Sequence, residues 1–267
     1  MARCLARFAV RALYFEVKSH PKPGLVSFVC PGGHQDMHGE LFYRSLFSLR
    51  HYFYTLVRQD AVSRDFQGLK ALGIQAEEQM LRATGGVNTH RGALFALGLV
   101  SVSVARLAMK NPRFTPLDLH LQLVHDWDKT LASHQGAPDS HGALVAKKHA
   151  VIGAKEMARQ GYPIIFCILD DFLQMCAAQH ALEHCCLYAY ARLLEQIDDT
   201  NILYRHDAPG LMEAKYYAKQ LLSIDHLEAR HQYALEVHDL FSKHHISPGG
   251  VGDLIAVLFF VGQLFQR

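Results

Sequence analysis

Hydrophobic side chains recur with the spacing of one helix face along most of this chain. Tyr162 to Leu169 is the one run that also suits a strand, although Pro163 near its start suits the first turn of a buried helix. We therefore expect an all-α fold, with residues 1–267 forming a single compact multi-helix domain. The predicted helices span residues 3–19, 38–58, 67–83, 89–109, 116–133, 142–160, 168–197, 210–223, 227–244 and 251–266.

Composition narrows the class of protein. Half of the 267 residues are hydrophobic and 19% are charged, which suits a large buried core. Lys and Arg total 27 against 25 Asp and Glu, so we expect no nucleic-acid partner. The apolar run from Leu254 to Phe265 is too short to cross about 30 Å of hydrocarbon, so we expect no membrane partner. Six irregularly spaced cysteines without a C-x-x-C pair, and no secretory signal, indicate reduced thiols and a cytoplasmic location.

Four connections combine glycine with polar side chains at predicted helix ends, and we expect these Gly-rich loops to form the active site. Glycine lets a backbone approach a ligand closely, and a helix N-terminus attracts anions. In the second connection Arg91 adds a forked phosphate donor. Ordinary helix caps are the alternative interpretation of these connections. They span residues 21–36, 84–92, 198–201 and 247–253.

The third connection contains the adjacent acids Asp198 and Asp199, followed by Asn201. Neighbouring carboxylates suit Mg²⁺, which binds through one or two carboxylates together with substrate phosphates. The acids follow the predicted helix 168–197, where the helix dipole disfavours negative charge. The alternative interpretation is a solvated turn.

One motif suggests a different chemistry. His180, Glu183 and His184 match H-x-x-E-H, an inverted zinc-peptidase pattern that would place both imidazoles on one helix face. This chain has 18 histidines, so such a match arises easily by accident. A zinc-dependent hydrolase is therefore the alternative function.

The connections, taken together and in order, resemble the triphosphoribosyl-dephospho-CoA synthase family. The residues after Leu25-Val26, Ser27-Phe28, look more like the malonate decarboxylase branch than the citrate lyase branch. The matching segments cover nearly the whole chain: Glu16, Pro21-Lys22-Pro23-Gly24-Leu25-Val26, Gly33-His34-Gln35-Asp36-Met37, Thr84 to Gly92, Leu94 to Gly98, Ser140-His141-Gly142, Asp199-Thr200-Asn201, Arg205, Ser247-Pro248-Gly249-Gly250 and Asp253-Leu254.

The resemblance implies a transferase reaction on ATP and 3′-dephospho-CoA. The 2′-hydroxyl of dephospho-CoA takes the triphosphoribosyl group, and adenine is released. The product is the precursor of the prosthetic group of a decarboxylase or lyase acyl-carrier protein, which a downstream transfer enzyme would load. The resemblance also implies an all-α fold.

The reaction suggests a role for each matching residue. Carboxylates would stabilise positive charge on the sugar and accept the hydroxyl proton, and Asp36 or His34 would assist the attack or the departure of adenine. His34, Asp36, Asp198 and Asp199 are therefore the predicted catalytic residues. Asp198 and Asp199 are also the predicted ligands of a Mg²⁺ ion that accompanies ATP. The predicted nucleotide-binding residues are Lys22, Gly85, Gly86, Asn88, Thr89, Arg91, Asn201, Arg205, Gly249, Gly250 and Asp253.

Two segments depart from the family pattern. Lys155 stands where the family usually has Arg, and Glu156 lies one position early, so no catalytic role is carried onto either residue. After Arg205 the usual glycine is replaced by the run 206–209.

Overall fold

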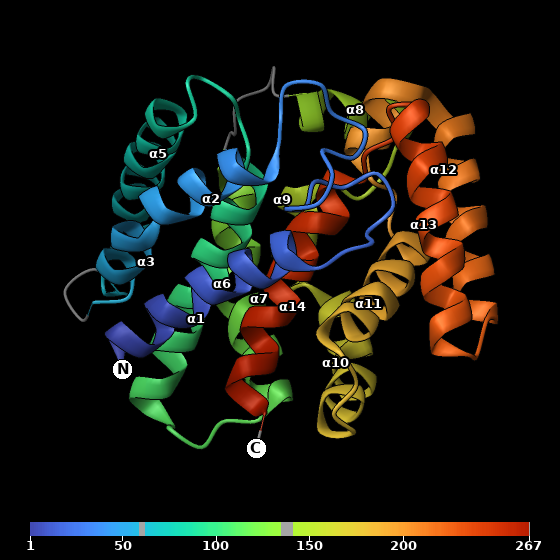
Figure 1. The fold of residues 1–267 in the computed structure, drawn as a ribbon. Coiled ribbons are helices and arrows are strands. Elements are labelled where there is room, and N and C mark those ends of the chain that lie inside the picture. The colour runs from blue at the N-terminus through green and yellow to red at the C-terminus, as the bar shows by residue number, and fades with distance from the viewer. Residues whose placement is uncertain (59–61, 135–140, 267) are drawn as a thin grey trace.

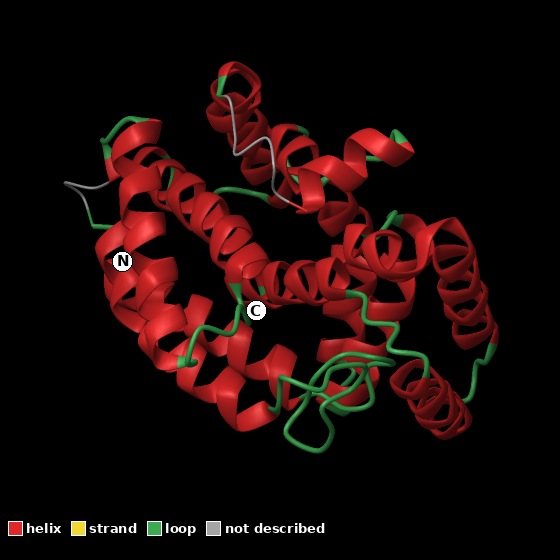
Figure 2. Ribbon diagram, turned by 90° about the horizontal axis from the view of Figure 1, so that it is seen from above, coloured by secondary structure: helices red, strands yellow, loops and turns green. Residues whose placement is uncertain are grey.

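The structure is a computed structural model that describes residues 1–58, 62–134 and 141–266. Every regular element in those ranges is a helix, which confirms the all-α prediction (Figures 1 and 2). The helices are α1 Ala2–Lys18, α2 Gly39–Ser48, α3 Arg50–Leu56, α5 Phe66–Ala83, α6 Arg91–Lys110, α7 Pro116–Ser133, α8 His141–His149, α9 Ala154–Arg159, α10 Pro163–Ala177, α11 Leu182–Gln196, α12 Thr200–Ser223, α13 Leu227–Lys243 and α14 Gly249–Phe265.

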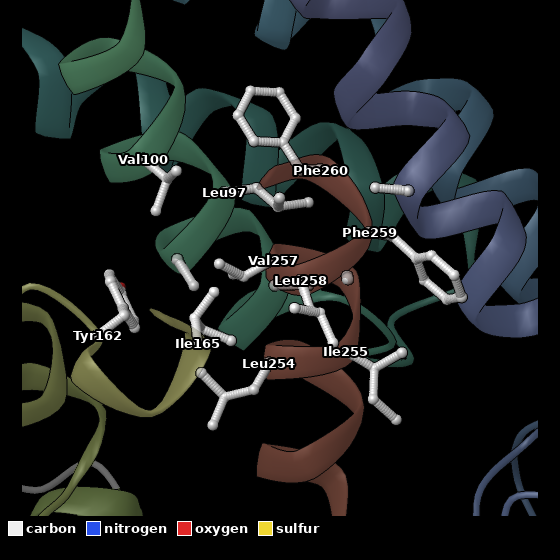
Figure 3. Packing of buried hydrophobic residues seen from close by; sticks show 14 of the residues in the cluster. Leu97, Val100, Tyr162, Ile165, Leu254, Ile255, Val257, Leu258, Phe259 and Phe260 are labelled. Carbon is white, nitrogen blue, oxygen red and sulfur yellow. The ribbon is translucent and has the colours of Figure 1, made fainter. Parts of the chain in front are cut away.

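Two apolar helices, α6 and α14, lie at the centre of the hydrophobic core and pack against each other (Figure 3). Nearly every residue of α14 from Val251 to Gly262 is buried, as its apolar sequence predicts. Helix α6 is long and apolar enough to cross a membrane, but 72% of its most apolar window is buried inside the protein. It is therefore a core helix, surrounded by α1, α3, α5, α7 and α14.

Three long predicted helices are each broken in two. The segment 38–58 divides into α2 and α3 at Leu49, and 142–160 divides into α8 and α9 after Ala150. The segment 168–197 divides near Gln179, so the strand-like run 162–169 belongs to α10. Ala150 and Gln179 have φ angles of 53° and 57°, a left-handed conformation that stops a helix. Hydrophobic periodicity does not record such breaks.

Helix α12 begins at Thr200, well before the predicted start at residue 210. It bends at Asp207, which has φ 53° and ψ −161°, two residues before Pro209. Asp199 is consequently the N-cap of α12. The expectation that the helix dipole disfavours this acid was wrong, because negative charge is stabilised at a helix N-terminus.

The N-termini of α6, α12 and α14 meet near the middle of the molecule. A carboxylate from α12 accepts hydrogen bonds from the start of α14, and a carboxylate from α14 contacts the start of α6. The long loop between α1 and α2, residues 19–38, runs beside this junction and contacts the segment before α14 (Figure 1). Parts of all four Gly-rich connections therefore come together in space.

Candidate functional site

Asp199 connects two of the converging helices. Its Oδ1 accepts hydrogen bonds from the backbone N–H groups of Asn201 and Ile202 at 2.9 and 3.2 Å, which caps α12. Its Oδ2 accepts from Val251 N at 2.9 Å, which caps α14. Burial raises the pKa of Asp199, while these backbone hydrogen bonds oppose the rise. One side chain thus satisfies the free amides of two helix ends.

Asp253 does the same for the third helix. It projects from the first turns of α14 and accepts a hydrogen bond from Ala93 N near the start of α6. A Cβ at Gly92 would lie 1.9 Å from Asp253 Oδ2, so only glycine leaves room for the carboxyl group. Gly92 thus makes room for a side chain of the protein itself.

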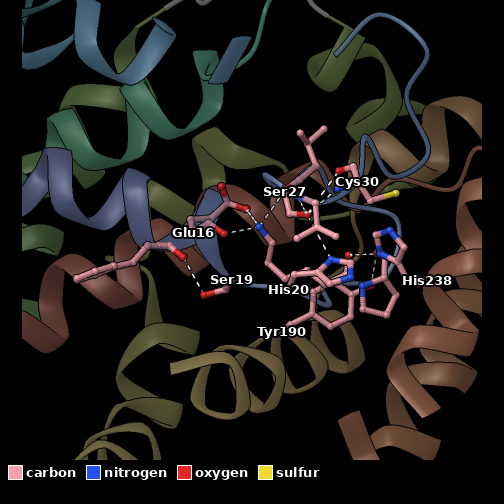
Figure 4. Close-up of polar contacts among 12 residues, drawn as sticks. Glu16, Ser19, His20, Ser27, Cys30, Tyr190 and His238 are labelled. Atoms are coloured by element: carbon pink, nitrogen blue, oxygen red, sulfur yellow. Dashed lines mark hydrogen bonds and ion pairs between the residues drawn. The ribbon is translucent and has the colours of Figure 1, made fainter. Parts of the chain in front are cut away.

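The third carboxylate belongs to Glu16 of α1, whose buried side chain pairs with the fully buried Lys22. Lys22 Nζ lies 2.7 Å from Glu16 Oε1 and 3.1 Å from Val26 O, and it also donates to the Glu16 carbonyl. Figure 4 shows Glu16 with these contacts. Lys22, predicted to bind a nucleotide, uses its three donors within the protein.

We call Glu16, Asp199 and Asp253 the acidic centre. Burial, together with the charges of Asp199 and Glu16, raises the pKa of Asp253 well above its ordinary value. Asp199 and Glu16 are 1% and 6% exposed, whereas Asp253 is only partly buried. Lys22 supplies one positive charge to this group of three acids. Glu16 was not among the predicted site residues, although it stands at the start of the family-like segments.

Two buried polar atoms close to the acidic centre have no hydrogen-bond partner in the described part of the chain. They are the Tyr162 hydroxyl and His90 Nε2. Burial and the charge of Asp253 raise the pKa of Tyr162. Burial and the charge of Lys22 lower the pKa of His90 to about 3, so its imidazole is neutral.

A polar pocket opens beside the acidic centre. Three predicted residues, His34, Asp36 and Arg205, line it together with Gly33, Gln35 and His245, and its volume is about 370 Å³. His34 Nε2 lies 2.8 Å from Ser247 Oγ, and His34 Nδ1 lies 3.7 Å from Asp36 Oδ1. Burial and Arg205 lower the pKa of His34, which favours a neutral ring.

The start of α14 joins the pocket to the acidic centre. Ser247, the partner of His34, directly precedes Pro248 and the first residues of α14. Asn201 and Arg205 lie one helical turn apart on α12. The Asn201 amide contacts Gly249, where a Cβ would lie 2.8 Å from its Nδ2. The pocket and the acidic centre therefore lie on either side of the start of α14.

The sequence model of the family described as ATP:dephospho-CoA triphosphoribosyl transferase matches residues 2–267. The chain belongs to this family. It is 32% identical to a probable 2-(5″-triphosphoribosyl)-3′-dephosphocoenzyme-A synthase of Acinetobacter calcoaceticus, over 94% of this chain and 87% of the relative. It is 34% identical to a protein of the same name from Stutzerimonas stutzeri, over 98% and 92% of the two chains. No solved structure matches the chain.

Membership in this transferase family identifies the protein as an enzyme.

In the Gly-rich connection 84–92, most of the predicted nucleotide-binding side chains contact other residues of the protein. Gly85 and Gly86 are exposed turn residues with φ angles of 66° and 91°. Asn88 Oδ1 accepts from Arg91 N, and the Arg91 side chain pairs with Glu77. Thr89 donates to Ser45 Oγ at 2.7 Å. The polar side chains of this connection are thus bound within the protein, while His90, and not Asn88 or Thr89, is the N-cap of α6.

The structure does not bring Asp198 and Asp199 together as a ligand pair. Asp198 Oδ1 lies 2.5 Å from Lys215 Nζ, while both oxygens of Asp199 accept backbone hydrogen bonds. Among the described residues no group of three His, Cys, Asp or Glu side chains is arranged to hold a metal ion. The two acids therefore do not fit a resident Mg²⁺ site.

The two histidines of the H-x-x-E-H motif do not lie on one helix. Helix α11 begins at Leu182, so His180 precedes the helix and does not share a face with His184, contrary to the prediction. His184 Nε2 instead lies 3.3 Å from Glu228 Oε1. Among the residues that the structure describes, no zinc ligand set forms there. Family membership favours the transferase over the hydrolase.

The structure also shows the state of the cysteines and the contacts of the residues that depart from the family pattern. All six cysteines are free thiols. Lys155 donates to the His134 carbonyl and Glu156 pairs with Arg159, both at the surface. Ser140, part of the family-like segment Ser140-His141-Gly142, lies outside the described residues.

Proposed function

We propose that this enzyme transfers the triphosphoribosyl group of ATP to the 2′-hydroxyl of 3′-dephospho-CoA and releases adenine. The observation that carries the proposal is the meeting of three helix N-termini around the acidic centre. Carboxylates stabilise the positive charge that develops on a sugar when its glycosidic bond breaks. The family description names the same two substrates.

Residues of the pocket beside the acidic centre suit two roles, phosphate binding and acceptance of the hydroxyl proton. Arg205 would hold phosphate groups of one substrate, with Asn201, Gly249 and Gly250 along the path of that substrate. Asp36, whose Oδ1 lies 3.7 Å from His34 Nδ1, would accept the proton of the attacking hydroxyl. Asp36 is 65% exposed in its side chain, so a substrate can reach it.

Purified protein with ATP, Mg²⁺ and 3′-dephospho-CoA should release adenine and form one heavier CoA species. Liquid chromatography and mass spectrometry would detect both products. CoA itself, which carries a 3′-phosphate beside the attacking hydroxyl, should react poorly and is the matched control. Release of ADP or pyrophosphate in place of adenine would overturn the proposal.

Mg²⁺ is proposed to arrive bound to the triphosphate of ATP. Asp198, which is half-exposed, would reach the ion only after leaving Lys215. The Asp198→Asn variant should then need more Mg²⁺ for half-maximal adenine release, with unchanged stability. An unchanged Mg²⁺ requirement would remove Asp198 from this role.

We further propose that the product serves malonate decarboxylase, through a transfer enzyme that loads its acyl-carrier protein. The Ser27-Phe28 sequence supports this branch. Cells that lack the protein should lose malonate decarboxylation and keep citrate cleavage. Loss of citrate cleavage alone would assign the citrate lyase branch.

A further inference from the structure

We propose that Asp253 is the acid that protonates adenine as it leaves the ribose of ATP, and that the Tyr162 hydroxyl binds the same base. The inference rests on the proposed function and assigns residues to one half of its chemistry. Two observations support it. The three carboxyl groups of the acidic centre have different hydrogen-bond partners, and the buried Tyr162 hydroxyl, which is near Asp253, has no partner among the described residues.

Asp253 is the member of the acidic centre that is left for a ligand. The Glu16 carboxylate is held by Lys22, and the Asp199 oxygens accept backbone N–H groups from two helices. Among the described residues, Asp253 has one hydrogen bond, from Ala93 N, and it is the most exposed of the three acids. Its carboxyl therefore keeps hydrogen-bonding capacity on the side away from α6.

The groups packed around Asp253 favour its protonated form. They are the carboxylates of Glu16 on α1 and Asp199 at the start of α12, and Lys22 is already paired with Glu16. Three anions beside one cation would leave buried negative charge uncompensated. Burial and the charges of Asp199 and Glu16 raise the pKa of Asp253 well above its ordinary value, which favours a protonated carboxyl group.

Tyr162 provides a second observation that points to a ligand. Its side chain is 2% exposed, and its hydroxyl has no hydrogen-bond partner among the described residues. Figure 3 shows it beside Ile165, in the core between α10 and α14. A buried hydroxyl without a partner is unfavourable unless a ligand supplies one. Adenine offers ring-nitrogen acceptors for the Tyr162 hydroxyl and for the Asp253 proton.

The proposed step balances as follows. The bond between C1′ of the ribose and N9 of adenine breaks, and its electron pair leaves with the base. Asp253 gives its proton to a ring nitrogen of the departing adenine. The 2′-hydroxyl oxygen of dephospho-CoA forms the new bond to C1′, and its proton passes to the carboxylate of Asp36. Exchange with water then returns a proton to Asp253 and removes one from Asp36.

The test compares two leaving groups. Adenine release from ATP needs the acid, whereas 4-nitrophenolate leaves from a ribose 5-triphosphate without protonation. With ATP, Asp253→Asn should release adenine at least about a hundredfold more slowly than the unmodified enzyme. With the nitrophenyl substrate it should stay within about threefold, because asparagine keeps the size and the acceptor of aspartate. Tyr162→Phe should raise KM for ATP several-fold and leave KM for the nitrophenyl substrate unchanged.

Controls keep the two proposals apart. The unmodified enzyme must first release adenine from ATP, since failure there rejects the proposed function and not the role of Asp253. Asp170→Asn, at an exposed acid on α10, should match the unmodified enzyme with both substrates. Equal losses on both substrates, or no loss with ATP, would overturn the proposal for Asp253.

A measurement on the unmodified enzyme covers the case in which Asp253→Asn does not fold. Raising the pH should slow adenine release as Asp253 loses its proton, while nitrophenolate release should not slow. Parallel pH profiles for the two substrates would contradict the inference.

Discussion

The acidic centre and the polar pocket lie side by side at the start of α14, yet their ionisable side chains differ in burial and in the distance between partners. In the acidic centre the Lys22 and Glu16 side chains are 0% and 8% exposed and 2.7 Å apart. In the pocket the His34 and Asp36 side chains are 12% and 65% exposed and 3.7 Å apart. A buried charge depends on its partner because water cannot replace it. The centre should therefore govern stability as well as chemistry, while the pocket should govern substrate binding.

The largest effect is expected for Lys22→Met, which leaves the three acids without a cation. Breaking a buried ion pair costs about 3–5 kcal/mol of unfolding free energy. Urea unfolding at pH 7.5 would measure the loss. Adding Glu16→Gln should recover part of it, and Lys155→Met at the surface should cost less than about 0.5 kcal/mol. If Lys22→Met were as stable as the unmodified protein, the centre would not depend on this pair.

Asp199→Ala should have the next largest effect, because it uncaps α12 and α14 together. One lost cap costs about 1–2 kcal/mol, so the unfolding free energy should fall by about 2–4 kcal/mol. Asp198→Ala is the matched control. Its half-exposed pair with Lys215 should contribute less than about 1 kcal/mol. Equal losses for the two variants would contradict the different roles that the structure gives these neighbours.

Acidification tests the buried His90. Its pKa is about 3 in the folded protein and 6.5 when unfolded, so the unfolded chain binds the proton first. Stability from the neutral ring is complete above pH 6.5 and falls as the pH drops toward 3. By pH 5 the loss should be about 2 kcal/mol. His90→Gln should remove most of this acid sensitivity in urea titrations, whereas His51→Gln, at an exposed position, should retain it.

Arg205→Gln should show that a residue of the polar pocket affects substrate binding and leaves stability almost unchanged. Losing one exposed phosphate contact should raise KM for one substrate about tenfold, or about 1.4 kcal/mol, with little change in kcat or in melting temperature. Steady-state kinetics with each substrate varied in turn would identify the one bound. Arg113→Gln, at an exposed position outside both regions, is the control. A lowered melting temperature for Arg205→Gln would place this residue with the structural charges.

The smallest effect is expected in the separated histidine motif. His180→Ala and His184→Ala should each keep adenine release within about twofold, because neither residue contacts the acidic centre or lines the pocket. Metal analysis should find well under one zinc per chain. Stoichiometric zinc, with activity lost in both variants, would restore the hydrolase alternative.

The site could be predicted in part. Three residues predicted from separate chain segments, His34, Asp36 and Arg205, line one cavity. Roles within the segments were harder to assign: Lys22 pairs internally with Glu16, and Arg91 pairs with Glu77. A lysine or arginine in a Gly-rich loop has the same sequence pattern whether its partner is a phosphate or a carboxylate of the protein.

The sequence by itself determined the helical class, the apolar helices α6 and α14, and the positions of polar connections at helix ends. Those properties depend on side chains three or four residues apart, which a local pattern records. Only the tertiary structure decided which helix ends meet. His34 and Ser247, 213 residues apart, become hydrogen-bond partners through the packing of several helices. The acidic centre likewise draws on α1, α12 and α14, and its charges are set by burial, which the order of residues along a chain does not specify.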